Sequence, residues 1–348
     1  MKISLIQNNS EWDHLLQLFS RSLLQTSEWG DFNSKGLNKE VQKIALYDKE
    51  NPVALALCII EVGRFGSYIY IPRGPLIDWN NGELVSNLFE ELKNYFASEN
   101  PVFIRFDPAI FPPNDVSQVF QTIFKVKSPY NTQVKRAWVL NLEGGNSEEL
   151  MKHARQQGMH KKFPGEIRRA EQKGVSYRRA YSIDDFKIFY RLLDETSTKK
   201  GFKIRPEEYY LKEFEFLSKS DLIRLYISEF EGEPLSVALV GKYNKEGSYL
   251  HAASADKHSN LSAQGFLLWK IIEELHSEGF KRFNFWGVVD ENNLQDSSHL
   301  GYGYSKFKMR FGGHVEEYVG SHDIIMRPVK YRLTWVQEKY RKWRLGLE

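Results

Sequence analysis

Apolar residues in the first half of the chain predict two strands, a helix and a third strand. Residues 53–62 form an almost unbroken apolar run, which is typical of a buried strand, and residues 67–71 form a second strand after a turn. Residues 83–96 place apolar side chains at helical spacing and predict an amphipathic helix. A further strand is predicted at residues 102–106, where an Asp-Pro pair follows and ends it.

The second half of the chain repeats this order of elements. Strands are predicted at residues 235–242 and 248–253, a helix at residues 265–276 and a third strand at residues 281–286. No repeat of individual residues accompanies the repeated order. The pattern therefore predicts an α/β protein with two similar domains.

We place the first domain at residues 1–146 and the second at residues 147–328, and expect the helix at residues 329–348 to pack back on the first. A chain of 348 residues is too long for one ordinary hydrophobic core, which supports two domains. With 41% hydrophobic and 27% charged residues, the chain has the balance of a folded globular protein and not of a disordered one.

Net charge, aromatic content and cysteine content narrow the class of protein further. The net charge of +3 predicts no strong general attraction to nucleic acid, so any RNA contact should be local. Aromatic residues make up 14%, and such rings line clefts that hold bases, sugars and peptides. The single cysteine, Cys58, excludes an internal disulfide, and its apolar surroundings indicate a core residue in a reducing compartment. Because the N-terminus turns polar early and no stretch approaches ~20 apolar residues, we expect a cytoplasmic protein.

Two segments are strongly basic. Residues 147–174 include Arg168 and Arg169 within a predicted helix, and this segment is either a solvated linker or a strip that touches phosphates. The helix predicted at residues 329–344 carries aromatic rings near one face among lysines and arginines. It either packs on the first domain or contacts an anionic membrane surface or an RNA backbone.

Several common signatures of active sites are absent from the sequence. It has no P-loop, no His-Glu-x-x-His motif and no Gly-x-Ser-x-Gly elbow, which argues against a P-loop nucleotide site and a zinc enzyme. The order of elements in the second half is that of acyltransferases that use acyl-CoA. However, the loop that would hold the pyrophosphate, residues 258–265, has one glycine and no preceding arginine, so a CoA site is not favoured.

One short stretch near the C-terminus carries the strongest chemical signal. Residues 307–313 read FKMRFGG, between a Gly/Tyr-rich loop predicted at residues 301–304 and a strand predicted at residues 315–319. Lys308 is a cation on an apolar stem, where two glycines let the backbone bend sharply. Such a lysine can meet negative charge that appears only during a reaction, although a surface lysine beside a turn would give the same pattern.

Other polar candidates lie in aromatic surroundings. Arg205 stands just before a helix predicted at residues 206–217, and Tyr209 follows one turn later, which suits a diphosphate or carboxylate ligand. Tyr249 and His251 alternate with an apolar residue on a predicted strand, so we expect both to face the same side of the sheet.

Taken together, these features resemble the Fem (FemABX) family of tRNA-dependent peptidoglycan-bridge aminoacyltransferases. The similar segments run through nearly the whole chain in the family's order. They are QTSEWG at residues 25–30, YIPRGP at residues 70–75, FIRFDP at residues 103–108, Arg205 with Tyr209, YxxAxS at residues 249–254 with Asn260 and Leu261, FWG at residues 285–287 and FKxxFGG at residues 307–313. Each segment is weak alone, and together they are specific.

The resemblance implies two domains of the GNAT acyltransferase type, with helices packed on mixed, mainly antiparallel sheets. It also implies transfer of an amino acid from aminoacyl-tRNA to an amine on the stem peptide of a peptidoglycan precursor. That precursor would be UDP-linked or lipid-linked, in the cytoplasm or at the inner face of the membrane. Because the aminoacyl ester is already activated, no cofactor or metal is expected. Too few residues separate the helices predicted at residues 183–197 and 206–217 to hold the helical arm of some members, so the chain is similar to the compact members.

The resemblance and the residue chemistry together assign roles to individual residues. Lys308 would be the catalytic cation that stabilises the oxyanion or the departing ribose oxygen. Asp107, at the end of a predicted strand, would accept a proton from the amine, unless it only caps the turn at Pro108. The remaining candidates would bind the precursor (Lys35, Arg73, Arg205, Tyr209, Tyr249 and His251) or the tRNA (Phe307, Arg310, Arg168 and Arg169).

Two segments depart from the family's pattern. Where members often carry a lysine for the precursor's phosphates, this chain has Asp31 and Asn33, and Lys35 is a shifted substitute. Residues 161–169 differ from the Arg/Asn-rich run that is usual there, and Pro164 with the glycine after it predicts a local bend.

Two other functions are compatible with the sequence. One is N-acyl transfer from acyl-CoA or acyl carrier protein to a small amine or sugar. The other is a non-catalytic protein that binds the cell-wall precursor without turnover.

Overall fold

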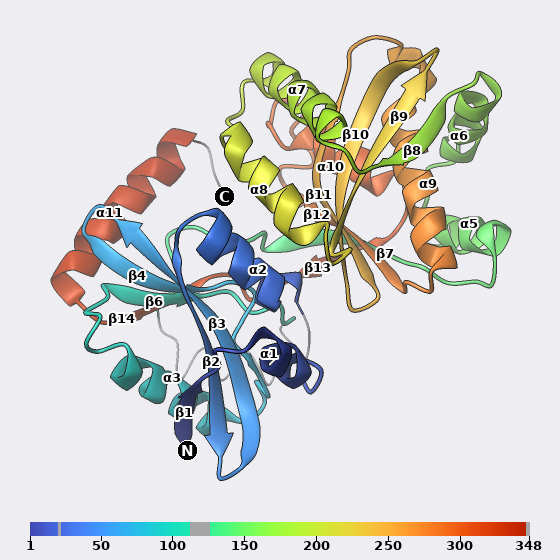
Figure 1. Ribbon diagram of the computed structural model, residues 1–348. Helices are drawn as coiled ribbons and strands as arrows, with labels where there is room; N and C mark the ends of the chain where they lie inside the picture. Colours follow the sequence, from blue (N-terminus) through green and yellow to red (C-terminus); the bar gives the residue numbers. More distant parts are fainter. Residues whose placement is uncertain (20–21, 112–125, 346–348) are drawn as a thin grey trace. The chain divides into compact units, whose positions relative to one another are not determined.

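The chain forms two units, each built on its own sheet (Figure 1). The computed structural model describes residues 1–19, 22–111 and 126–345. Unit 1 comprises Met1–Lys135 and Glu317–Glu348, and unit 2 comprises Arg136–Glu316. Within the described residues each unit has a seven-stranded sheet.

Unit 1 has a mixed, mainly antiparallel sheet with the strand order β1-β2-β3-β4-β6-β14. Neighbours in this order are antiparallel except β4 and β6, which run parallel, and β5 pairs with β3 outside it. The strands are β1 (Lys2–Leu5), β2 (Glu40–Asp48), β3 (Asn51–Gly63), β4 (Gly66–Ile71), β5 (Leu76–Ile77), β6 (Phe103–Phe106) and β14 (His322–Ile325).

Helices cover both faces of the unit 1 sheet, which explains the unbroken apolar run in β3. Alternate side chains of β3 pack against α1 (Asn9–Leu16) on one face and α3 (Gly82–Tyr95) on the other. Cys58 is fully buried in the cluster with α3, and burial raises the pKa of its thiol, so the prediction of a core residue is confirmed. The remaining helical elements of unit 1 are η1 (Leu23–Gln25), α2 (Ser27–Asp31), the π-turn η2 (Phe32–Gly36) and α11 (Pro328–Leu345).

Unit 2 has the strand order β13-β7-β12-β11-β10-β9-β8. Strands β11 and β12 run parallel, whereas β10 pairs antiparallel with both of its neighbours. The strands are β7 (Arg136–Asn141), β8 (Ser176–Ala180), β9 (Ile223–Phe230), β10 (Glu233–Tyr243), β11 (Glu246–Ser254), β12 (Arg282–Gly287) and β13 (His314–Glu317).

The helices of unit 2 also lie on both faces of its sheet. Helix α9 packs with α5 and α6 into one large apolar cluster, and α7 contacts β10 and β11 from the other face (Figure 1). The helices are α5 (Ser147–Gln156), α6 (Phe163–Gln172), α7 (Ile183–Lys200), α8 (Glu207–Leu217), α9 (Ala263–Ser277) and α10 (Tyr302–Met309), with the short turn η3 (Ser259–Leu261). Six residues join α7 to α8, and they contain no further helix.

The repeated order of elements predicted from the sequence occurs in both units. In each, an antiparallel hairpin (β3–β4 or β10–β11) is followed by a helix (α3 or α9) and a strand parallel to the hairpin's second strand. In each sheet, the strand that pairs with the other edge of this parallel strand comes from outside the hairpin, helix and strand segment. Strand β14 pairs with β6 although it follows unit 2 in the chain, and β7 pairs with β12 although it precedes that unit's helices.

Two local predictions at glycine and proline are wrong. The loop predicted at residues 301–304 is instead the beginning of α10, where a Cβ on Gly301 would come within 2.2 Å of the Val289 side chain. The bend predicted at Pro164 is instead the first turn of α6. Proline is tolerated there because its missing N–H would have no partner within the helix.

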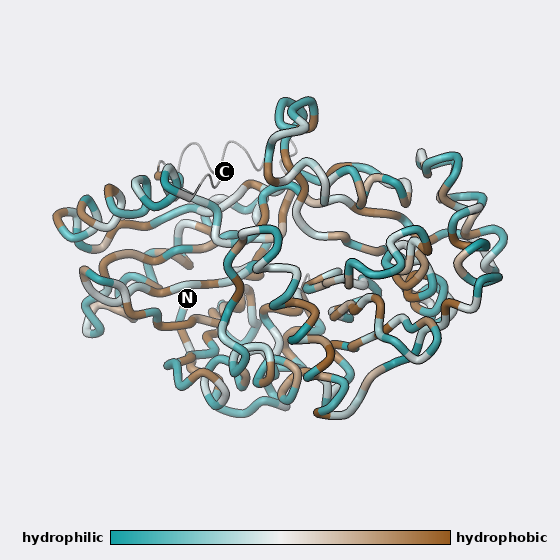
Figure 2. The backbone as a smooth tube through the Cα atoms, turned by 90° about the horizontal axis from the view of Figure 1, so that it is seen from above, coloured by the Kyte–Doolittle hydropathy of each residue, from teal (hydrophilic) through white to brown (hydrophobic). Residues whose placement is uncertain are grey.

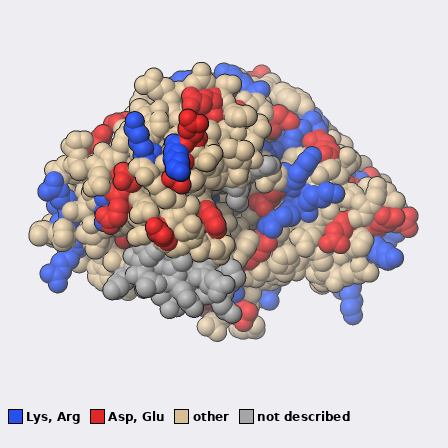
Figure 3. Space-filling view, turned by 90° about the horizontal axis from the view of Figure 1, so that it is seen from below, with Lys and Arg blue, Asp and Glu red and all other residues tan. Residues whose placement is uncertain are grey.

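The distribution of hydrophobic and polar residues along the helices follows from the packing of helices on the sheets. Figure 2 shows hydrophobic and hydrophilic residues alternating along the helices, as expected when one side of a helix faces a sheet. Figure 3 shows acidic and basic side chains interspersed over one face of the molecule. The small net charge therefore reflects mixed charges rather than an uncharged surface.

A buried arginine ties the C-terminal segment to the sheet of unit 1. The Arg105 side chain is 1% exposed, and its guanidinium donates to both carboxylate oxygens of Asp323, at 2.8 and 2.9 Å. It also donates to both carboxylate oxygens of Glu338, at 3.1 and 2.8 Å, and the Tyr331 hydroxyl donates to Asp323 at 2.9 Å. Because Asp323 lies on β14 and Glu338 on α11, one arginine holds both elements.

We expect Arg105→Met to lower the free energy of unfolding of unit 1 by about 3–5 kcal/mol, because two carboxylates stay buried without their cation. Urea unfolding followed by circular dichroism measures this change. The matched control is Lys187→Met, which removes an exposed ion pair with Asp184 and should leave the unfolding curve nearly unchanged. An equally small loss for Arg105→Met would contradict the proposed anchoring.

Candidate active site

Aromatic packing fixes the segment that carries Lys308. Lys308 lies in the last turn of α10, directly after Phe307 and three residues before Phe311. Phe311 is fully buried, and its ring contacts those of Phe163, Phe285 and Phe307 at centroid distances of 4.5, 5.0 and 5.5 Å. The two phenylalanines that flank the lysine therefore anchor it to the core of unit 2.

The two glycines that follow Phe311 lie too close to neighbouring backbone atoms to carry a side chain. Gly312 and Gly313 have φ angles of 81° and 115°. A Cβ on Gly312 would lie 2.4 Å from the carbonyl oxygen of Ala154, and one on Gly313 would lie 2.2 Å from that of Val139. The Trp138 indole N–H donates to the Gly312 carbonyl at 2.8 Å. The two glycines thus supply both the bend predicted from the sequence and the close approach to α5 and β7.

The amine of Lys308 is enclosed at the end of β12. It donates to the Gly287 carbonyl oxygen at 2.6 Å and lies 5.0 Å from the centroid of the Tyr304 ring. Burial lowers its pKa to about 7, and among the described residues no carboxylate forms an ion pair with it. Trp286, which precedes Gly287, has a φ of 65°, a conformation that is costly for a bulky residue and typical of functional sites. Near neutral pH this amine can serve as a cation or as a neutral base.

The lysine hollow, as we name it, surrounds this amine and has a volume of about 410 Å³. It opens beside β11 and β12, whose parallel pairing covers only the first residues of each strand. Its walls come from the end of α7, from β11, from the start of α9, from β12 and from α10. The lining residues are Thr196, Lys200, residues 249–254, Gln264, Trp286, Gly303, Tyr304, Phe307 and Lys308.

Tyr249 and His251 both line the lysine hollow, but the expectation that they face the same side of the sheet is wrong. The register of β11 shifts between them, because Tyr249 pairs with Val240 and His251 pairs with the preceding residue, Leu239. This β-bulge turns the Tyr249 hydroxyl toward α9, where it accepts from the Gln264 amide at 2.7 Å. His251 instead lies 3.1 Å from the Glu213 carboxylate on α8.

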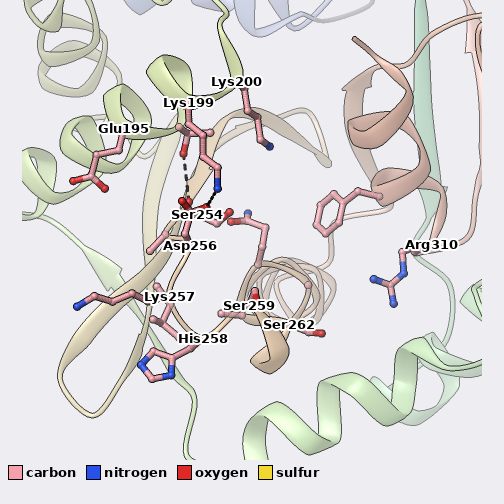
Figure 4. Close-up of a pocket in the computed structure, with 17 residues that line it drawn as sticks. Glu195, Lys199, Lys200, Ser254, Asp256, Lys257, His258, Ser259, Ser262 and Arg310 are labelled. Atoms are coloured by element: carbon pink, nitrogen blue, oxygen red, sulfur yellow. Dashed lines mark hydrogen bonds and ion pairs between the residues drawn. The ribbon is translucent and has the colours of Figure 1, made fainter. Parts of the chain in front are cut away.

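A second cavity, the α9 hollow, adjoins the lysine hollow and has a volume of about 390 Å³ (Figure 4). Both hollows are lined by Thr196, Lys200, Ser254, Gln264 and Phe307. The remaining walls of the α9 hollow are the end of α7, residues 255–259, the first turn of α9 and Arg310. Figure 4 shows Lys199 pointing at Asp256, with which it forms an ion pair.

The three arginines predicted to bind tRNA fall into two groups. Arg310 lines the α9 hollow, where its guanidinium lies 5.0 Å from the Phe163 ring and pairs with the Glu166 carboxylate. Arg168 and Arg169 are exposed on α6 and do not line that hollow. Their contact with tRNA stays a prediction.

Arg205 and Tyr209 lie together, as the sequence indicated. Arg205 is exposed just before α8, and its guanidinium lies 5.3 Å from the centroid of the Tyr209 ring. Among the described residues no carboxylate pairs with this guanidinium. An exposed arginine stacked on a phenol and without an acid partner suits an anionic ligand.

In unit 1, Lys35 lines a polar hollow of about 390 Å³ next to α2. It pairs with Asp31 at 2.8 Å, and Asp31 in turn accepts from the Asn9 amide at 3.1 Å. Lys43 on β2 lines the same hollow and donates to the Asn9 side chain. Burial lowers the pKa of Lys43, against the opposing effect of Asp31.

Arg73 and Asp107 are both buried in unit 1. The Arg73 guanidinium donates to the Val134 carbonyl at 2.8 Å and lies 4.3 Å from the centroid of the Tyr318 ring. Asp107 accepts from the Arg73 backbone N–H at 2.8 Å and from the Tyr70 hydroxyl at 2.9 Å. Burial raises the pKa of its carboxyl. These contacts give both residues a structural part in unit 1, and their roles in binding and proton transfer stay predictions.

Comparison with known proteins decides the family of this chain. The model of the FemAB family matches residues 10–118, 120–231 and 218–339. The chain belongs to the FemAB family. The resemblance noted from short motifs is thereby confirmed over nearly the whole length.

Relatives and solved structures agree with membership of the FemAB family. Aminoacyltransferase FemB of Staphylococcus epidermidis is 22% identical over 414 aligned positions, which cover 94% of this chain and 94% of that protein. Aminoacyltransferase FemA of the same species is 20% identical, with 95% of each chain covered. The crystal structure of FemX superimposes with a TM-score of 0.84, at 18% identity, over 96% of this chain and 99% of that one. A tandem GNAT protein from the clavulanic acid pathway gives a TM-score of 0.57 at 10% identity over 93% of this chain, so the predicted fold of two GNAT-type domains is confirmed.

Sequence reasoning missed several residues of this FemAB-family site. Lys200 and Gln264 line both hollows of unit 2, and Tyr304 covers the Lys308 amine. Lys43 could have been found as a lysine directly before the apolar residues 44–46 of β2. The others carry no local signal, because only the packing of α7, α9 and α10 brings them to one cavity. Among the described residues no group of His, Cys, Asp and Glu is suited to hold a metal ion.

We expect Lys308→Met to stabilise the protein at pH 6 and to lose this advantage as the pH rises from about 7 toward 10.5. The folded state holds the lysine with a lowered pKa, so the charged amine destabilises the fold fully below pH 7. Loss of the hydrogen bond to Gly287 lowers the stability of the variant by an amount that does not depend on pH. Thermal unfolding at pH 6 and pH 9.5 measures the difference, with the exposed Lys306→Met on the same helix as the control. A difference that does not change with pH would contradict the lowered pKa.

Proposed function

We propose that this protein transfers an amino acid from an aminoacyl-tRNA to an amine on the stem peptide of a peptidoglycan precursor. The observation that carries this proposal is the enclosed Lys308 amine, which lines a hollow and has no acid partner among the described residues. Membership of the FemAB family and the aminoacyltransferase names of two relatives support the same reaction.

The α9 hollow is the proposed site for the charged 3′ end of the tRNA. Helix α9 begins there without a side-chain cap, so the N–H groups of its first turn favour an anion such as a phosphate. Lys200 adds positive charge, and the ring of Phe307 offers a surface on which a base can stack. Within the described residues the amide oxygen of Gln264 is buried without a hydrogen-bond partner, so it can accept from a donor group of the ligand. Arg310 lines the same hollow, and Arg168 and Arg169 are the proposed contacts outside it.

The precursor is the proposed ligand of a separate group of residues. Arg205 with Tyr209 suits its diphosphate, because the guanidinium is exposed and pairs with no carboxylate in the part of the chain that the structure describes. Tyr249 and His251 line the lysine hollow and would contact the stem peptide near the reacting amine. Lys35 is a further phosphate candidate within unit 1, and its hollow contains a second lysine, Lys43.

The reaction needs alignment and charge stabilisation. The precursor amine attacks the ester carbonyl, a C–N bond forms, the C–O bond to the ribose breaks, and the proton lost by the amine balances the one gained by the ribose oxygen. Holding both reactants in place supplies roughly 7–11 kcal/mol of the barrier. As a cation, Lys308 stabilises the oxyanion or the departing ribose oxygen. With a pKa of about 7 it can also donate a proton to that oxygen at neutral pH.

Asp107 is the proposed proton acceptor of this mechanism. Burial raises the pKa of its carboxyl, which makes it a stronger base than an exposed aspartate. Its two oxygens accept from the Arg73 backbone and the Tyr70 hydroxyl, and the cap at the turn before Pro108 is the alternative role that the sequence offers.

An acyl-CoA donor is the second candidate, because the uncapped start of α9 would also suit a pyrophosphate. Purified protein is therefore incubated with charged tRNAs or acyl-CoA and with a UDP-linked pentapeptide, and the products are weighed by mass spectrometry. Transfer that depends on charged tRNA and is abolished by ribonuclease supports the proposal. Transfer from acyl-CoA alone, or precursor binding without any transfer, would overturn it.

We expect Lys308→Met to lower kcat for aminoacyl transfer by about 10²–10³-fold, because the developing negative charge loses its preorganised cation. The KM for both substrates should change little. Lys306→Met, on the exposed side of the same helix, is the matched control and should retain normal turnover. Near-normal kcat for Lys308→Met, with the fold intact, would refute the proposed role.

We expect Arg205→Met to raise the KM for the precursor roughly 10-fold or more, because a charge-assisted hydrogen bond contributes about 1.5–3 kcal/mol. Turnover at saturating precursor should be nearly unchanged. Arg191→Met on α7, an exposed arginine paired with Glu195, serves as the control. An equal effect of both substitutions on KM would contradict a specific contact at Arg205.

A further inference from the structure

The outer face of α11 carries an exposed apolar stripe. Five of its residues are spaced alternately four and three positions apart, which brings them onto one face of the helix. They are Val329, Leu333, Val336, Tyr340 and Trp343, with exposures of 78%, 50%, 59%, 59% and 77%. The opposite face, with Tyr331 and Glu338, is held to unit 1 by the cluster around Arg105. The stripe is thus presented outward by a helix whose other side is anchored.

Basic residues border this stripe on both sides. Residues 327–344 contain seven of them: Arg327, Lys330, Arg332, Lys339, Arg341, Lys342 and Arg344. Helical spacing puts Arg332 and Lys339 on one border, and Lys330, Arg341 and Arg344 on the other. The single acidic residue in this range, Glu338, is paired with Arg105 on the inner face. The exposed surface of α11 therefore combines apolar and positively charged groups without negative ones.

The hairpin between β3 and β4 extends the same surface. At its tip Val62 is 90% exposed, and Arg64, two residues further on, is also exposed. A Cβ on Gly66 would lie 3.9 Å from the amine of Lys330, so this hairpin adjoins the start of α11. A second apolar and basic element thus continues the patch within unit 1.

We propose that this face of α11 docks in the plane of an anionic lipid bilayer. An apolar stripe with basic borders is the pattern of a helix that lies at a membrane interface, and Tyr340 and Trp343 are side chains that favour the headgroup region. A second copy of the chain fits less well, because two such faces would bring like charges together. Nucleic acid fits less well, because phosphates offer no partner to Leu333 and Val336. Among the described residues no helix is long and apolar enough to cross a membrane, so the contact is peripheral.

Vesicle flotation of the purified full chain tests this proposal without tRNA or precursor. We expect the protein to float with phosphatidylcholine vesicles that contain phosphatidylglycerol, to stay unbound with phosphatidylcholine alone, and to be released by salt. Leu333→Ser with Trp343→Ser should weaken binding roughly tenfold or more. The matched control is Leu18→Ser with Leu300→Ser, at positions that are 63% and 83% exposed elsewhere.

A charge variant gives an independent measure. Lys330→Gln, Arg332→Gln and Arg341→Gln together should weaken binding to the anionic vesicles by roughly fivefold per charge removed, whereas Lys161→Gln, Lys162→Gln and Lys173→Gln should not. All changed residues are exposed, so thermal unfolding should be unaffected. No flotation of the wild type, or equal flotation of stripe and control variants, would overturn the proposal. Loss of a dimer in sedimentation of the stripe variant, without a change in flotation, would overturn it in favour of self-association.

A consequence for the acceptor rests on the proposed function. A transferase held at a bilayer should favour a lipid-linked precursor, so the stripe variant should lose transfer to that acceptor in vesicles but keep transfer to a UDP-linked one in solution. Equal loss with both acceptors, or no loss with either, would overturn the docking surface. Absence of transfer by the wild type to both acceptors would instead count against the proposed function.

Discussion

Enclosure of one amine is the constraint on which the candidate site depends. Lys308 hydrogen bonds to a backbone carbonyl and touches a tyrosine ring, but no described carboxylate neutralises it. An enclosed cation without an acid partner among the described residues costs folding free energy, and the packing of Phe311 and the two glycines holds its segment in place. A reaction that develops negative charge beside this amine can supply the anionic partner that the described residues do not provide.

The duplicated topology explains where that amine can be enclosed. In unit 2, β11 and β12 pair only at their first residues, and the bulge in β11 sends Tyr249 and His251 toward different helices. The gap between the strands becomes a cavity that α7, α9 and α10 close. Unit 1 has the same hairpin, helix and parallel strand, but its corresponding strand β6 carries Arg105, which is used to hold β14 and α11. One topology thus encloses the Lys308 amine in one unit and anchors the C-terminal segment in the other.

Anchoring of α11 has a further consequence for the surface of unit 1. Because Glu338 and Tyr331 fix the inner side of the helix, its apolar and basic outer side cannot turn inward to join the core. The outer side of α11 therefore keeps apolar surface exposed to solvent, which is typical of a surface that binds a partner or a membrane. The proposed interface with an anionic bilayer would account for both the stripe and its basic borders.

The sequence by itself determined the order of elements, the family and the proximity of Arg205 to Tyr209, because apolar periodicity and short motifs are local properties of the chain. The long apolar run around Cys58 predicted a buried strand for the same reason. The tertiary structure decided the rest. A single bulge reversed the side on which His251 lies relative to Tyr249. Residues predicted to form a loop begin α10 instead, where Gly301 lies too close to Val289 for a side chain. Gln264, Lys200 and Tyr304 joined the site only through the packing of three helices, since contacts between residues far apart in the chain leave no pattern in either segment alone.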